Sequence, residues 1–274
     1  KETKMRYLSD LRIHPSLQGS TLLARGFRLL KNEVFRPGEW AQTLVLEDNL
    51  RALEILASRR CGLPEYRPSG RYISWLLPRQ HIRPAPGIKV RRATVGDIGA
   101  MQALWDECSS RRCFSGVYDF SNLGQPFWDN LLVGDFLVAS AEGRIKGMMG
   151  LWDQSGFQRL RILGYPSWLG MIRPFRNIFA NVALPPAGQV LPIHKATAIA
   201  CEDDDPVVLR SMLATALAED KGCMIFLGFS ASDPLLAAMK GLQRRMSRGC
   251  HFLVGWDGEP PVWKEPFVFD PARI

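Results

Sequence analysis

The sequence contains no run of about 18 uncharged apolar residues, so it predicts no helix that could cross a membrane. Its first residues are polar and charged, which is not the pattern of a secretory signal peptide. The chain begins with Lys1, and we interpret this as a sequence whose upstream residues are missing. Together these absences predict a cytoplasmic protein with no membrane among its partners.

Cysteine and histidine are scarce, with six and four residues, and no two cysteines form a C-x-x-C pair. No cysteine has two histidines near it at the spacing of zinc ligands, so we predict no metal site. The cysteines are expected to be reduced and mostly buried, as in cytoplasmic proteins. They are Cys61, Cys108, Cys113, Cys201, Cys223 and Cys250.

Positive charge is concentrated in the first third of the chain. Residues 1–87 carry 15 Lys and Arg against 8 Asp and Glu, whereas residues 88–274 carry 20 against 19. This excess favours a polyanionic ligand on the first stretch, such as a nucleic acid or a cofactor with several phosphates. No basic run there is longer than two residues, which argues against a nucleic-acid-binding arm.

A proline-rich stretch at Leu77–Gly87 divides the chain near Pro86 and predicts two parts, residues 1–87 and residues 88–274. The first part predicts strand, helix, strand, helix and strand, at Met5–Ile13, Gly19–Glu33, Gln42–Leu46, Asp48–Arg59 and Arg71–Leu77. The second part ends in the same order of elements, at Lys195–Cys201, Asp205–Lys221, Met224–Phe229, Pro234–Arg245 and Cys250–Gly255. This order indicates an internal repeat whose first copy is truncated on its N-terminal side.

The second part also predicts elements that have no counterpart in the first. Thr94 and Asp97 have capping-box spacing for a helix over Val95–Ser110. Glu142 and Gly143 join two strands in a predicted hairpin. The remaining elements are strands at Ile88–Thr94, Phe136–Ala141, Arg144–Trp152 and Gln158–Gly164, and a helix at Pro126–Leu132.

Residues 11–19 read LRIHPSLQG, a predicted strand followed by a proline and a Gln-Gly loop that opens a helix. The N–H groups at a helix start point outward, and the helix dipole favours anions there. Gly19 lets the backbone come close to such a ligand. This arrangement is that of a phosphate-binding loop, although an ordinary turn before a helix has the same pattern.

The loop resembles the cofactor motif of the GNAT superfamily of acyl-CoA N-acyltransferases. In that motif a Val/Ile-x-Pro step is followed by Gln/Arg-x-x-Gly-x-Gly/Ala. This sequence matches it with Ile13-x-Pro15 and Gln18-Gly19-Ser20 and departs from it at the later small positions, Thr21 and Leu23. A second family feature, Asn-x-x-Ala after the next strand, is matched by Asn49-Leu50-Arg51-Ala52.

The resemblance implies an α/β (α+β) fold, with a mixed, mostly antiparallel GNAT-type sheet flanked by helices and two copies in tandem. It implies an acyl-CoA cofactor, acetyl-CoA as the acyl donor, lying between two strands that splay apart. The cofactor-binding residues carried over from the motif are Leu11, Arg12, Ile13, Gln18, Gly19, Ser20, Thr21, Leu22, Leu23 and Asn49. Asn49 is also a plausible helix cap without ligand contact.

The catalytic residues are not determined by the sequence. Acyl transfer to an amine needs a base for the ammonium and an acid for the thiolate leaving group. Family members often place a Tyr seven residues after the Asn, and this chain has Leu56 there. Tyr66 is a candidate acid and His14 a candidate base, with a packed aromatic ring and a capping residue as the respective alternatives.

The second copy is predicted not to bind the cofactor. Where its phosphate loop should follow the strand Lys195–Cys201, the chain reads Glu202-Asp203-Asp204-Asp205-Pro206. Four carboxylates at a helix start repel a pyrophosphate, and the proline removes one N–H donor. A divalent cation at these carboxylates is a further alternative.

Two functions follow from this interpretation. The first is transfer of an acyl group from acyl-CoA to a primary amine of a small molecule or a peptide, by direct attack on the thioester. The alternative is a non-catalytic GNAT-like binding or scaffold protein with a decayed cofactor site. A homo-oligomer is compatible with either. Because the resemblance places the family's first strands and helices before Lys1, we expect turnover by this chain to be impaired.

Overall fold

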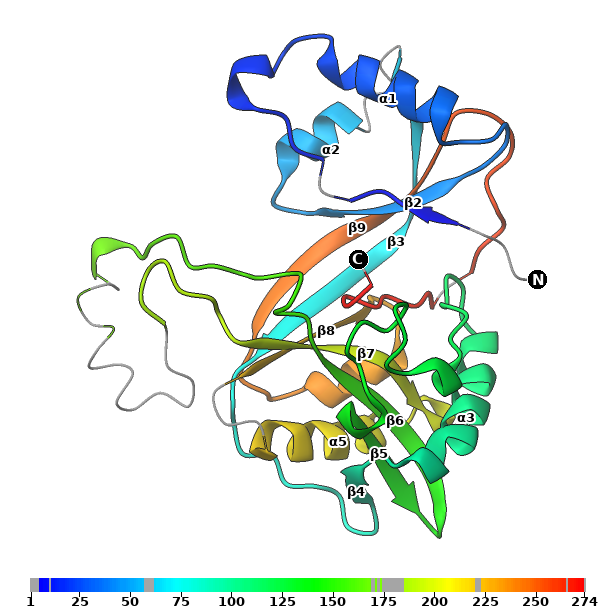
Figure 1. Ribbon diagram of the computed structural model, residues 1–274, viewed down its shortest axis with the longest axis vertical. Coiled ribbons are helices and arrows are strands. Elements are labelled where there is room, and N and C mark those ends of the chain that lie inside the picture. Colours follow the sequence, from blue (N-terminus) through cyan, green and yellow to red (C-terminus); the bar gives the residue numbers. More distant parts are fainter. Residues whose placement is uncertain are drawn as a thin grey trace. The chain divides into compact units, whose positions relative to one another are not determined.

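The computed structural model describes residues 5–9, 11–56, 62–168, 171, 173, 185–219, 223–264 and 266–273. The chain forms two compact units (Figure 1), of which unit 1 comprises Lys1–Ile73, Ser247–Glu265 and Ile274. Unit 2 comprises Ser74–Met246 and Pro266–Arg273. The units thus differ from the consecutive stretches 1–87 and 88–274, and the boundary at residue 87 stays a prediction about the sequence repeat.

Unit 1 contains four neighbouring strands in the order β1-β2-β9-β3. These strands are β1 (Arg6–Tyr7), β2 (Ala41–Leu46), β3 (Glu65–Leu77) and β9 (Arg245–Gly255). Its helices are the 3₁₀ turn η1 (Pro15–Leu17), α1 (Leu22–Glu33) and α2 (Leu50–Leu56). The predicted helix end at Arg59, and Cys61 with it, lies outside the described residues.

Unit 2 contains strands in the order β3-β8-β7-β6-β5-β4, flanked by helices α3 and α5 (Figure 1). The strands are β4 (Lys89–Arg92), β5 (Phe136–Ala141), β6 (Arg144–Asp153), β7 (Ile193–Cys201) and β8 (Met224–Ser230). The helices are α3 (Ile98–Ser110) and α5 (Pro206–Glu219). The 3₁₀ turns are η2 (Val95–Asp97), η3 (Phe120–Asn122), η4 (Val133–Asp135), η5 (Glu202–Asp204) and η6 (Pro234–Met239).

The predicted repeat is visible in the order of elements. The first copy reads β1-η1-α1-β2-α2-β3, and the second copy reads β7-η5-α5-β8-η6-β9. In each copy the first two strands are parallel, β1 with β2 and β7 with β8. The other pairings with a determined register are antiparallel. The predicted fold class, a mixed and mostly antiparallel sheet flanked by helices in two tandem copies, is therefore confirmed.

The two copies exchange their last strands. In unit 1, β2 of the first copy pairs antiparallel with β9, from Ala41 opposite Val254 to Leu46 opposite Gly249. In unit 2, β8 of the second copy neighbours β3, the last strand of the first copy. This exchange is the reason why the units do not follow the linear division of the sequence.

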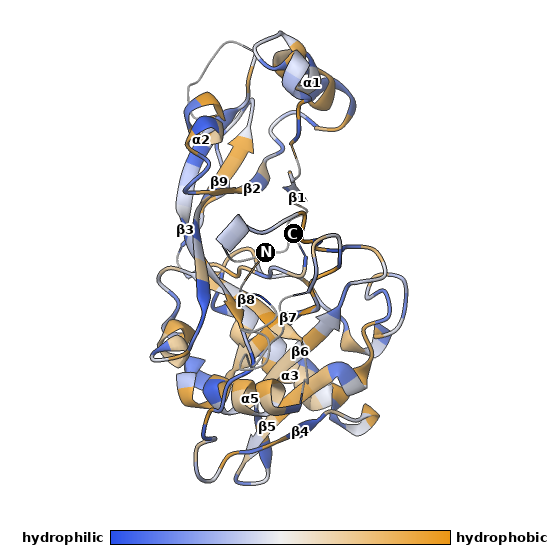
Figure 2. Ribbon diagram, turned by 90° about the vertical axis from the view of Figure 1, so that its left-hand side faces the viewer, coloured by the Kyte–Doolittle hydropathy of each residue, from blue (hydrophilic) through white to orange (hydrophobic). Residues whose placement is uncertain are grey.

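The helices that follow the parallel strands differ in how much of their surface is buried. Helix α1 has one buried residue, Phe27, among polar and charged neighbours. Helix α5 begins at Pro206, which favours the first helical position. It buries eight residues, and Figure 2 shows it mainly in the hydrophobic colour. Helix α1 therefore covers one side of a small core, whereas α5 is packed along much of its length.

Helix α3 and the hairpin β5–β6 form where local signals predict them. The backbone N–H of Thr94 donates to Oδ2 of Asp97 at 2.7 Å, so the capping box precedes α3 as expected. Glu142 and Gly143 have φ values of 53° and 80°, the left-handed conformation that a two-residue hairpin turn requires. Strong local patterns of this kind specify an element without help from distant residues.

The first predicted strand is much shorter than expected. The sequence predicts a strand over Met5–Ile13, but β1 covers only Arg6–Tyr7. The N–H of Leu8 donates to the carbonyl of Gln42 at 2.9 Å, and the carbonyl of Leu8 accepts from the hydroxyl of Thr43 at 2.6 Å. After this point the chain leaves β2, and Leu11–Ile13 are not a strand, while Asp10 lies outside the described residues.

Two predicted elements of unit 2 are wrong. Residues 126–132 form tight turns instead of a helix, because Asp129 and Asn130 have φ values of 26° and 63°. Residues 158–164 form one isolated bridge, at Arg161, instead of a strand. Both segments have apolar residues at suitable spacing, but several of these are exposed, among them Phe127, Leu132, Leu160 and Leu163.

A third predicted helix lies where the sequence predicts it but is a different kind of helix. The segment predicted as a helix over Pro234–Arg245 is a 3₁₀ helix that ends at Met239. Arg245 already belongs to β9, which is longer than the predicted Cys250–Gly255. The 3₁₀ helix therefore covers only the first half of the predicted helix.

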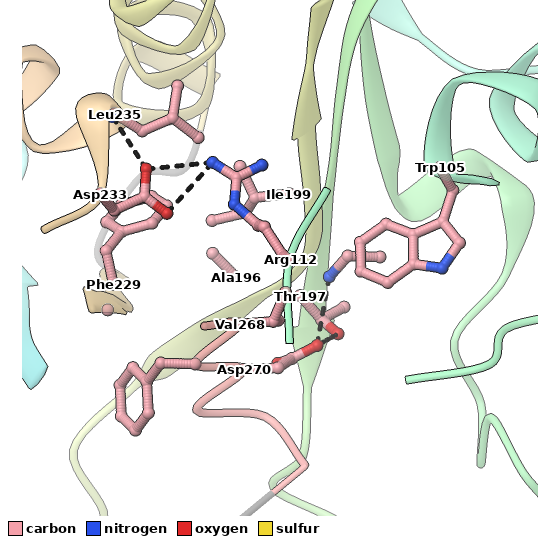
Figure 3. A pocket seen from close by; sticks show the side chains of 13 residues that line it. Trp105, Arg112, Ala196, Thr197, Ile199, Phe229, Asp233, Leu235, Val268 and Asp270 are labelled. Carbon is pink, nitrogen blue, oxygen red and sulfur yellow. Dashed lines mark hydrogen bonds and ion pairs between the residues drawn. The ribbon is translucent and has the colours of Figure 1, made fainter. Parts of the chain in front are cut away.

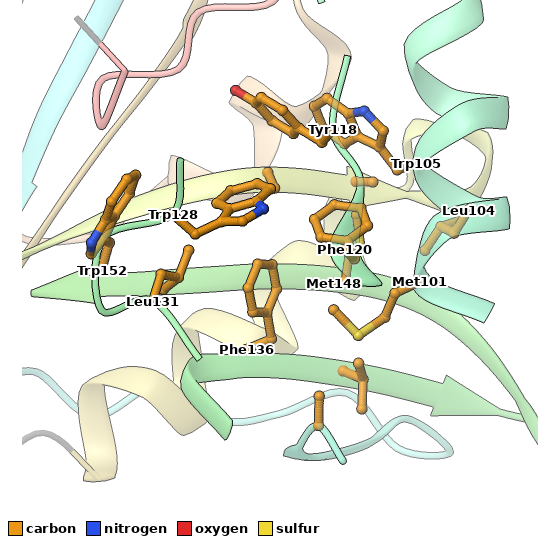
Figure 4. Close-up of a cluster of buried hydrophobic side chains, with 14 of the residues drawn as sticks. Met101, Leu104, Trp105, Tyr118, Phe120, Trp128, Leu131, Phe136, Met148 and Trp152 are labelled. Atoms are coloured by element: carbon orange, nitrogen blue, oxygen red, sulfur yellow. The ribbon is translucent and has the colours of Figure 1, made fainter. Parts of the chain in front are cut away.

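The core of unit 2 is rich in aromatic rings (Figure 4). The ring of Trp105 stacks on that of Tyr118 with centroids 4.8 Å apart, and Phe120 stacks on Trp128 at 5.7 Å. The core of unit 1 is smaller and is centred on Phe27, whose ring meets Tyr66 edge-on at 6.5 Å. Aromatic pairs in these geometries add to the stabilisation from burial.

No helix in the described part of the chain is long and apolar enough to cross a membrane. Cys108 and Cys201 are buried free thiols in unit 2, and burial raises the pKa of Cys108 to about 11. The described residues contain no group of three or more metal-ligating side chains placed to hold an ion.

Candidate functional site

The parallel strands β1 and β2 separate soon after they pair. Their register joins Arg6 to Ala41 and Tyr7 to Gln42, and β2 then continues to Leu46 without its partner. The backbone of β2 beyond this point faces a gap in the ladder on its β1 side. A divergence of two parallel strands is the feature that the predicted cofactor site requires between them.

The predicted phosphate loop lies between β1 and α1 and has the backbone of a tight turn. Gly19 has a φ of 81°, and a Cβ at this position would meet nothing within 4 Å. The hydroxyl of Ser20 donates to the carbonyl of Leu17 at 2.6 Å and accepts from the N–H of Leu22 at 3.2 Å. The side-chain amide of Gln18 donates to the carbonyl of Ile13 at 3.4 Å. The loop is thus held by its own hydrogen bonds and is exposed to solvent.

The start of α1 is electrostatically suited to an anion. Thr21, the N-cap residue, makes no side-chain capping bond, and the first turn contains no acidic residue. The first N–H groups of a helix have no partner within the helix, and the helix dipole adds partial positive charge there. Leu23, which departs from the motif, is half-buried and packs against the core of unit 1. Its bulk therefore lies on the core side.

Asn49 begins helix α2. Its side-chain oxygen accepts from the N–H of Ala52 at 3.2 Å, and its own N–H donates to the carbonyl of Leu46 at 3.1 Å. These are the bonds of an N-cap residue. Within the chain, Asn49 therefore acts as a helix cap. Its contact with a cofactor stays a prediction.

The two candidate catalytic residues lie in different environments. His14 is exposed and caps η1, with Nδ1 2.8 Å from the hydroxyl of Ser16. Tyr66 is buried in β3 beside Phe27, and burial raises the pKa of its hydroxyl. Leu56, at the position of the family's tyrosine, is buried in the same core. His14 therefore has an accessible side chain, while Tyr66 has the surroundings of a core residue.

The second copy has the same strand geometry. Strands β7 and β8 pair in parallel from Ile193 opposite Met224 to Lys195 opposite Phe226. Beyond Lys195 the register ends, although β7 continues to Cys201 and β8 to Ser230. The divergence of two parallel strands is thus present in both copies.

The loop after β7 is occupied by carboxylates that pair within the protein. Glu202 contacts Lys146 and lies 3.0 Å from Arg144, and the hydrogen bond from Lys146 lowers the pKa of the Glu202 carboxyl. Asp205 accepts from the N–H of Val207 at 2.8 Å and so occupies the helix start itself. Carboxylates of the protein itself thus occupy the place of an anion at this helix start, as the sequence predicts.

The buried side chain of Arg112 pairs with this loop and with Asp233. Nη1 of Arg112 lies 2.8 Å from Asp204, and Nη2 lies 3.1 Å from Asp233. The side chains of Arg112 and Asp233 are 5% and 4% exposed. Burial raises the pKa of the Asp233 carboxyl, and the charge of Arg112 opposes that shift. Arg112 thus neutralises two carboxylates that would otherwise be costly to bury.

The space between the diverging strands of the second copy is almost filled (Figure 3). The cavity that remains has a volume of about 30 Å³, which is enough to hold water. Asp270 of the C-terminal segment accepts from the hydroxyl of Thr197 at 2.6 Å and from the N–H of Ala198 at 3.3 Å. Val268 and Phe269 line the same space. The C-terminal segment therefore occupies part of the space between the diverging strands.

Comparisons with known proteins agree with this architecture. No family model matches the sequence, and no curated protein matches it. A GCN5-related N-acetyltransferase from Sphaerobacter thermophilus matches in structure with a TM-score of 0.55 and 13% identity, over 89% of this chain and 72% of that chain. A tandem GNAT protein from the clavulanic acid biosynthesis pathway, solved without acetyl-CoA, gives 0.53 and 9%, over 93% and 76%. The chain has the GNAT fold.

A third neighbour is an acetyltransferase from the GNAT family from Colwellia psychrerythraea, with a TM-score of 0.50 and 8% identity, over 91% of this chain and 77% of that chain. At these identities the likeness shows the GNAT fold alone. The reaction has to be argued from the residues of this chain.

Several residues that shape the second GNAT copy were not singled out by the sequence. Arg112 and Asp233 are 121 positions apart, and Asp270 reaches Thr197 across 73 positions. Their residue types are ordinary for a helix end, a turn and a chain terminus. No local pattern marks them, because their roles arise only from long-range packing.

Proposed function

We propose that the protein is an acyl-CoA-dependent N-acyltransferase with acetyl-CoA as its donor, bound to the first copy. Gln18–Leu23 would hold the pyrophosphate, Leu11–Ile13 the pantetheine arm, and Asn49 would lie near that arm. The acceptor is a primary amine of a small molecule or peptide. The amine attacks the thioester carbonyl, the C–N bond forms, the C–S bond breaks and CoA leaves as the thiolate.

One observation carries this proposal, namely the contrast between the two loops that follow the first strand of each copy. The first loop is exposed, turns at Gly19 and opens a helix with no acid in its first turn. The second loop holds Glu202–Asp205, and the space behind it is filled. Both copies have the same fold, so the two loops differ only in their residues. The residues of the first loop are compatible with an anion, and those of the second are not.

The protein's own residues must remove the proton of the acceptor ammonium. His14 is the better placed of the two candidates because its imidazole is exposed and it directly follows Leu11–Ile13, the residues proposed to hold the pantetheine arm. A tyrosine hydroxyl is protonated at neutral pH, so Tyr66 is a candidate only as an acid, and burial, which raises its pKa, makes it a weaker one.

Titration calorimetry with acetyl-CoA tests the proposed site. We expect micromolar binding by the chain, weaker binding of CoA without its 3′-phosphate, and loss of binding in Gln18→Ala/Gly19→Glu. A matched control is Gly38→Glu, because Gly38 also has a positive φ, of 74°, and open space at its Cβ. It follows the other end of the 12-residue helix α1, about 18 Å away. Equal losses in both variants would contradict the assignment.

A second function is favoured by one specific observation. Leu56 is a buried aliphatic residue at the position where GNAT enzymes often have the tyrosine that protonates the leaving thiolate. A protein that binds acetyl-CoA but does not turn over would fit this replacement. Release of CoA, followed with a thiol reagent over a panel of amines, separates the two: binding without release for any amine supports the binding protein.

A further inference from the structure

Four aromatic rings of unit 2 surround the guanidinium group of Arg273. Its Cζ lies 4.2 Å from the ring centroid of Phe127, 4.3 Å from Trp128, 4.6 Å from Trp152 and 5.4 Å from Tyr118. We call these four rings the aromatic cage. Each distance is within the range in which a cation is attracted to the face of a ring. Three of the rings are labelled in Figure 4.

Two of the cage rings, Trp128 and Trp152, are held by contacts that do not involve Arg273. The indole N–H of Trp128 donates to the carbonyl of Asp119 at 3.2 Å, and that of Trp152 donates to the carbonyl of Asp129 at 3.0 Å. The two indoles are also almost fully buried. The cage is therefore a feature of the core of unit 2, and it does not need the guanidinium to take its shape.

One side of the cage is open to solvent. Phe127 is 56% exposed, in contrast to Trp128, Trp152 and Tyr118, which are buried. The carbonyl of Phe127 accepts from Nη1 of Arg273 at 2.8 Å. The cage thus offers three buried ring faces, one ring at its edge and one backbone acceptor for an N–H group.

The guanidinium group of Arg273 does not make all of its possible hydrogen bonds in the cage. Nε and Nη2 of Arg273 are buried and have no hydrogen-bond acceptor among the described residues. Burying an N–H group without an acceptor lowers the net gain from the contact.

Arg273 is brought to the cage by the C-terminal segment, residues 266–273. This segment is anchored by Asp270, which accepts from the hydroxyls of Thr197 and Tyr118 at 2.6 and 3.0 Å. It is also anchored by Gln154, whose amide donates to the carbonyl of Ala272 at 2.7 Å. The anchors hold the backbone beside the cage, so removal of the Arg273 side chain empties the cage and leaves the segment tethered.

We propose that the aromatic cage is a binding site for a ligand that bears a guanidinium group, and that Arg273 occupies it as an internal ligand. Ring faces select a cation. The Phe127 carbonyl selects a cation with N–H donors over a quaternary ammonium, which has none. A ligand of this class enters by displacing the Arg273 side chain at the Phe127 edge. The proposal does not depend on the acyltransferase reaction.

Methylguanidinium is the probe, and binding is followed by tryptophan fluorescence and by chemical shifts of the indole N–H groups. We expect saturable, millimolar binding by Arg273→Ala and binding at least about ten-fold weaker by the unsubstituted chain, whose cage is occupied in cis. Arg83→Ala, which removes an exposed arginine of the same unit, is the control and should bind like the unsubstituted chain. Phe127→Ala in the Arg273→Ala background should weaken binding about ten-fold, because an exposed edge ring is lost without disturbing the core.

One further variant and one further ligand complete the test. Asp270→Asn loosens the anchor but keeps Arg273, and it should give an affinity between those of the unsubstituted chain and Arg273→Ala. Tetramethylammonium should bind Arg273→Ala more weakly than methylguanidinium does. The proposal is overturned if a folded Arg273→Ala shows no saturable binding, or if Phe127→Ala leaves that binding unchanged. Equal or tighter binding of tetramethylammonium overturns the guanidinium assignment.

Discussion

Ser69 and His251 are joined by a buried hydrogen bond between neighbouring strands of unit 1. The hydroxyl of Ser69 lies 2.5 Å from Nδ1 of His251, and Nε2 of His251 lies 3.1 Å from the side-chain oxygen of Gln42. A neutral imidazole fits with Nε2 donating to Gln42 and Nδ1 accepting from Ser69, whose hydroxyl also lies 3.2 Å from the carbonyl of His251. Burial lowers the pKa of His251 to about 4, because the charged form loses its hydration.

We therefore expect unit 1 to lose stability as the pH falls from about 6.5 to about 4. In this window the unfolded chain binds a proton at His251 and the folded chain does not, so the free energy of unfolding rises with pH, by at most about 1.4 kcal/mol per unit. Above the window this contribution is constant. His251→Gln keeps an acceptor and a donor but cannot be protonated. Urea unfolding at pH 5 and pH 7 should show a smaller difference in this variant, and an unchanged difference would exclude His251 as its source.

Removal of the buried Arg112 should be strongly destabilising. Arg112→Met leaves Asp204 and Asp233 without their shared partner, and we expect a loss of about 3–5 kcal/mol. Arg111→Met is the matched control, since the side chain of Arg111 is 40% exposed and such pairs contribute about 0–1 kcal/mol. The loss should shrink at lower pH, where the uncompensated Asp233 takes up a proton. Denaturant midpoints of the two variants measure this, and similar losses in both would contradict it.

Close packing between β6 and α5 should make Gly147 intolerant of a methyl group. A Cβ there would lie 2.4 Å from Cγ1 of Val208 and 3.1 Å from Cε of Met212. We expect Gly147→Ala to lower the free energy of unfolding by about 1–3 kcal/mol. Gly99→Ala, at an exposed helical position with open space, should instead raise it, by up to about 1 kcal/mol. Thermal unfolding of the two variants should shift in opposite directions, and a stabilised Gly147→Ala would show that the interface is looser than described.

Substitution of Tyr66 distinguishes a core ring from a catalytic acid. The ring packs edge-on against Phe27 and Phe252, at 6.5 and 5.9 Å. We expect Tyr66→Phe to keep these contacts and to retain acyl transfer within about twofold, because burial places the hydroxyl away from solvent. His14→Ala should reduce kcat by about 10²-fold or more if His14 is the base. A loss of that size in Tyr66→Phe, with unchanged acetyl-CoA binding, would identify Tyr66 as the acid.

Local signals account for the elements that were predicted correctly. The capping box at Thr94 and Asp97, the hairpin turn at Glu142-Gly143 and Pro206 at a helix start each act within a few residues. The acidic loop of the second copy was also readable, because four successive carboxylates exclude an anion wherever the chain places them. The order of elements was enough to predict the repeat and the GNAT-type sheet.

Features that depend on distant residues could not be predicted. The apolar pattern of Pro126–Leu132 is compatible with a helix, and only packing against the core of unit 2 makes it irregular. The exchange of β3 and β9 leaves no trace in either strand, because a buried strand has the same composition beside any neighbour. The aromatic cage is likewise invisible in the sequence, since Arg273 lies 146 positions from Phe127.

The exchanged strands also affect how the protein is synthesised. Unit 1 starts at the N-terminus but needs β9, and Ser247 lies 174 positions after Ile73. At about 5–20 residues per second, the ribosome takes roughly 10–35 seconds to make that stretch. During this time β2 has an open edge where β9 will pair. The sheet of unit 1 is therefore completed only after most of unit 2 has been synthesised.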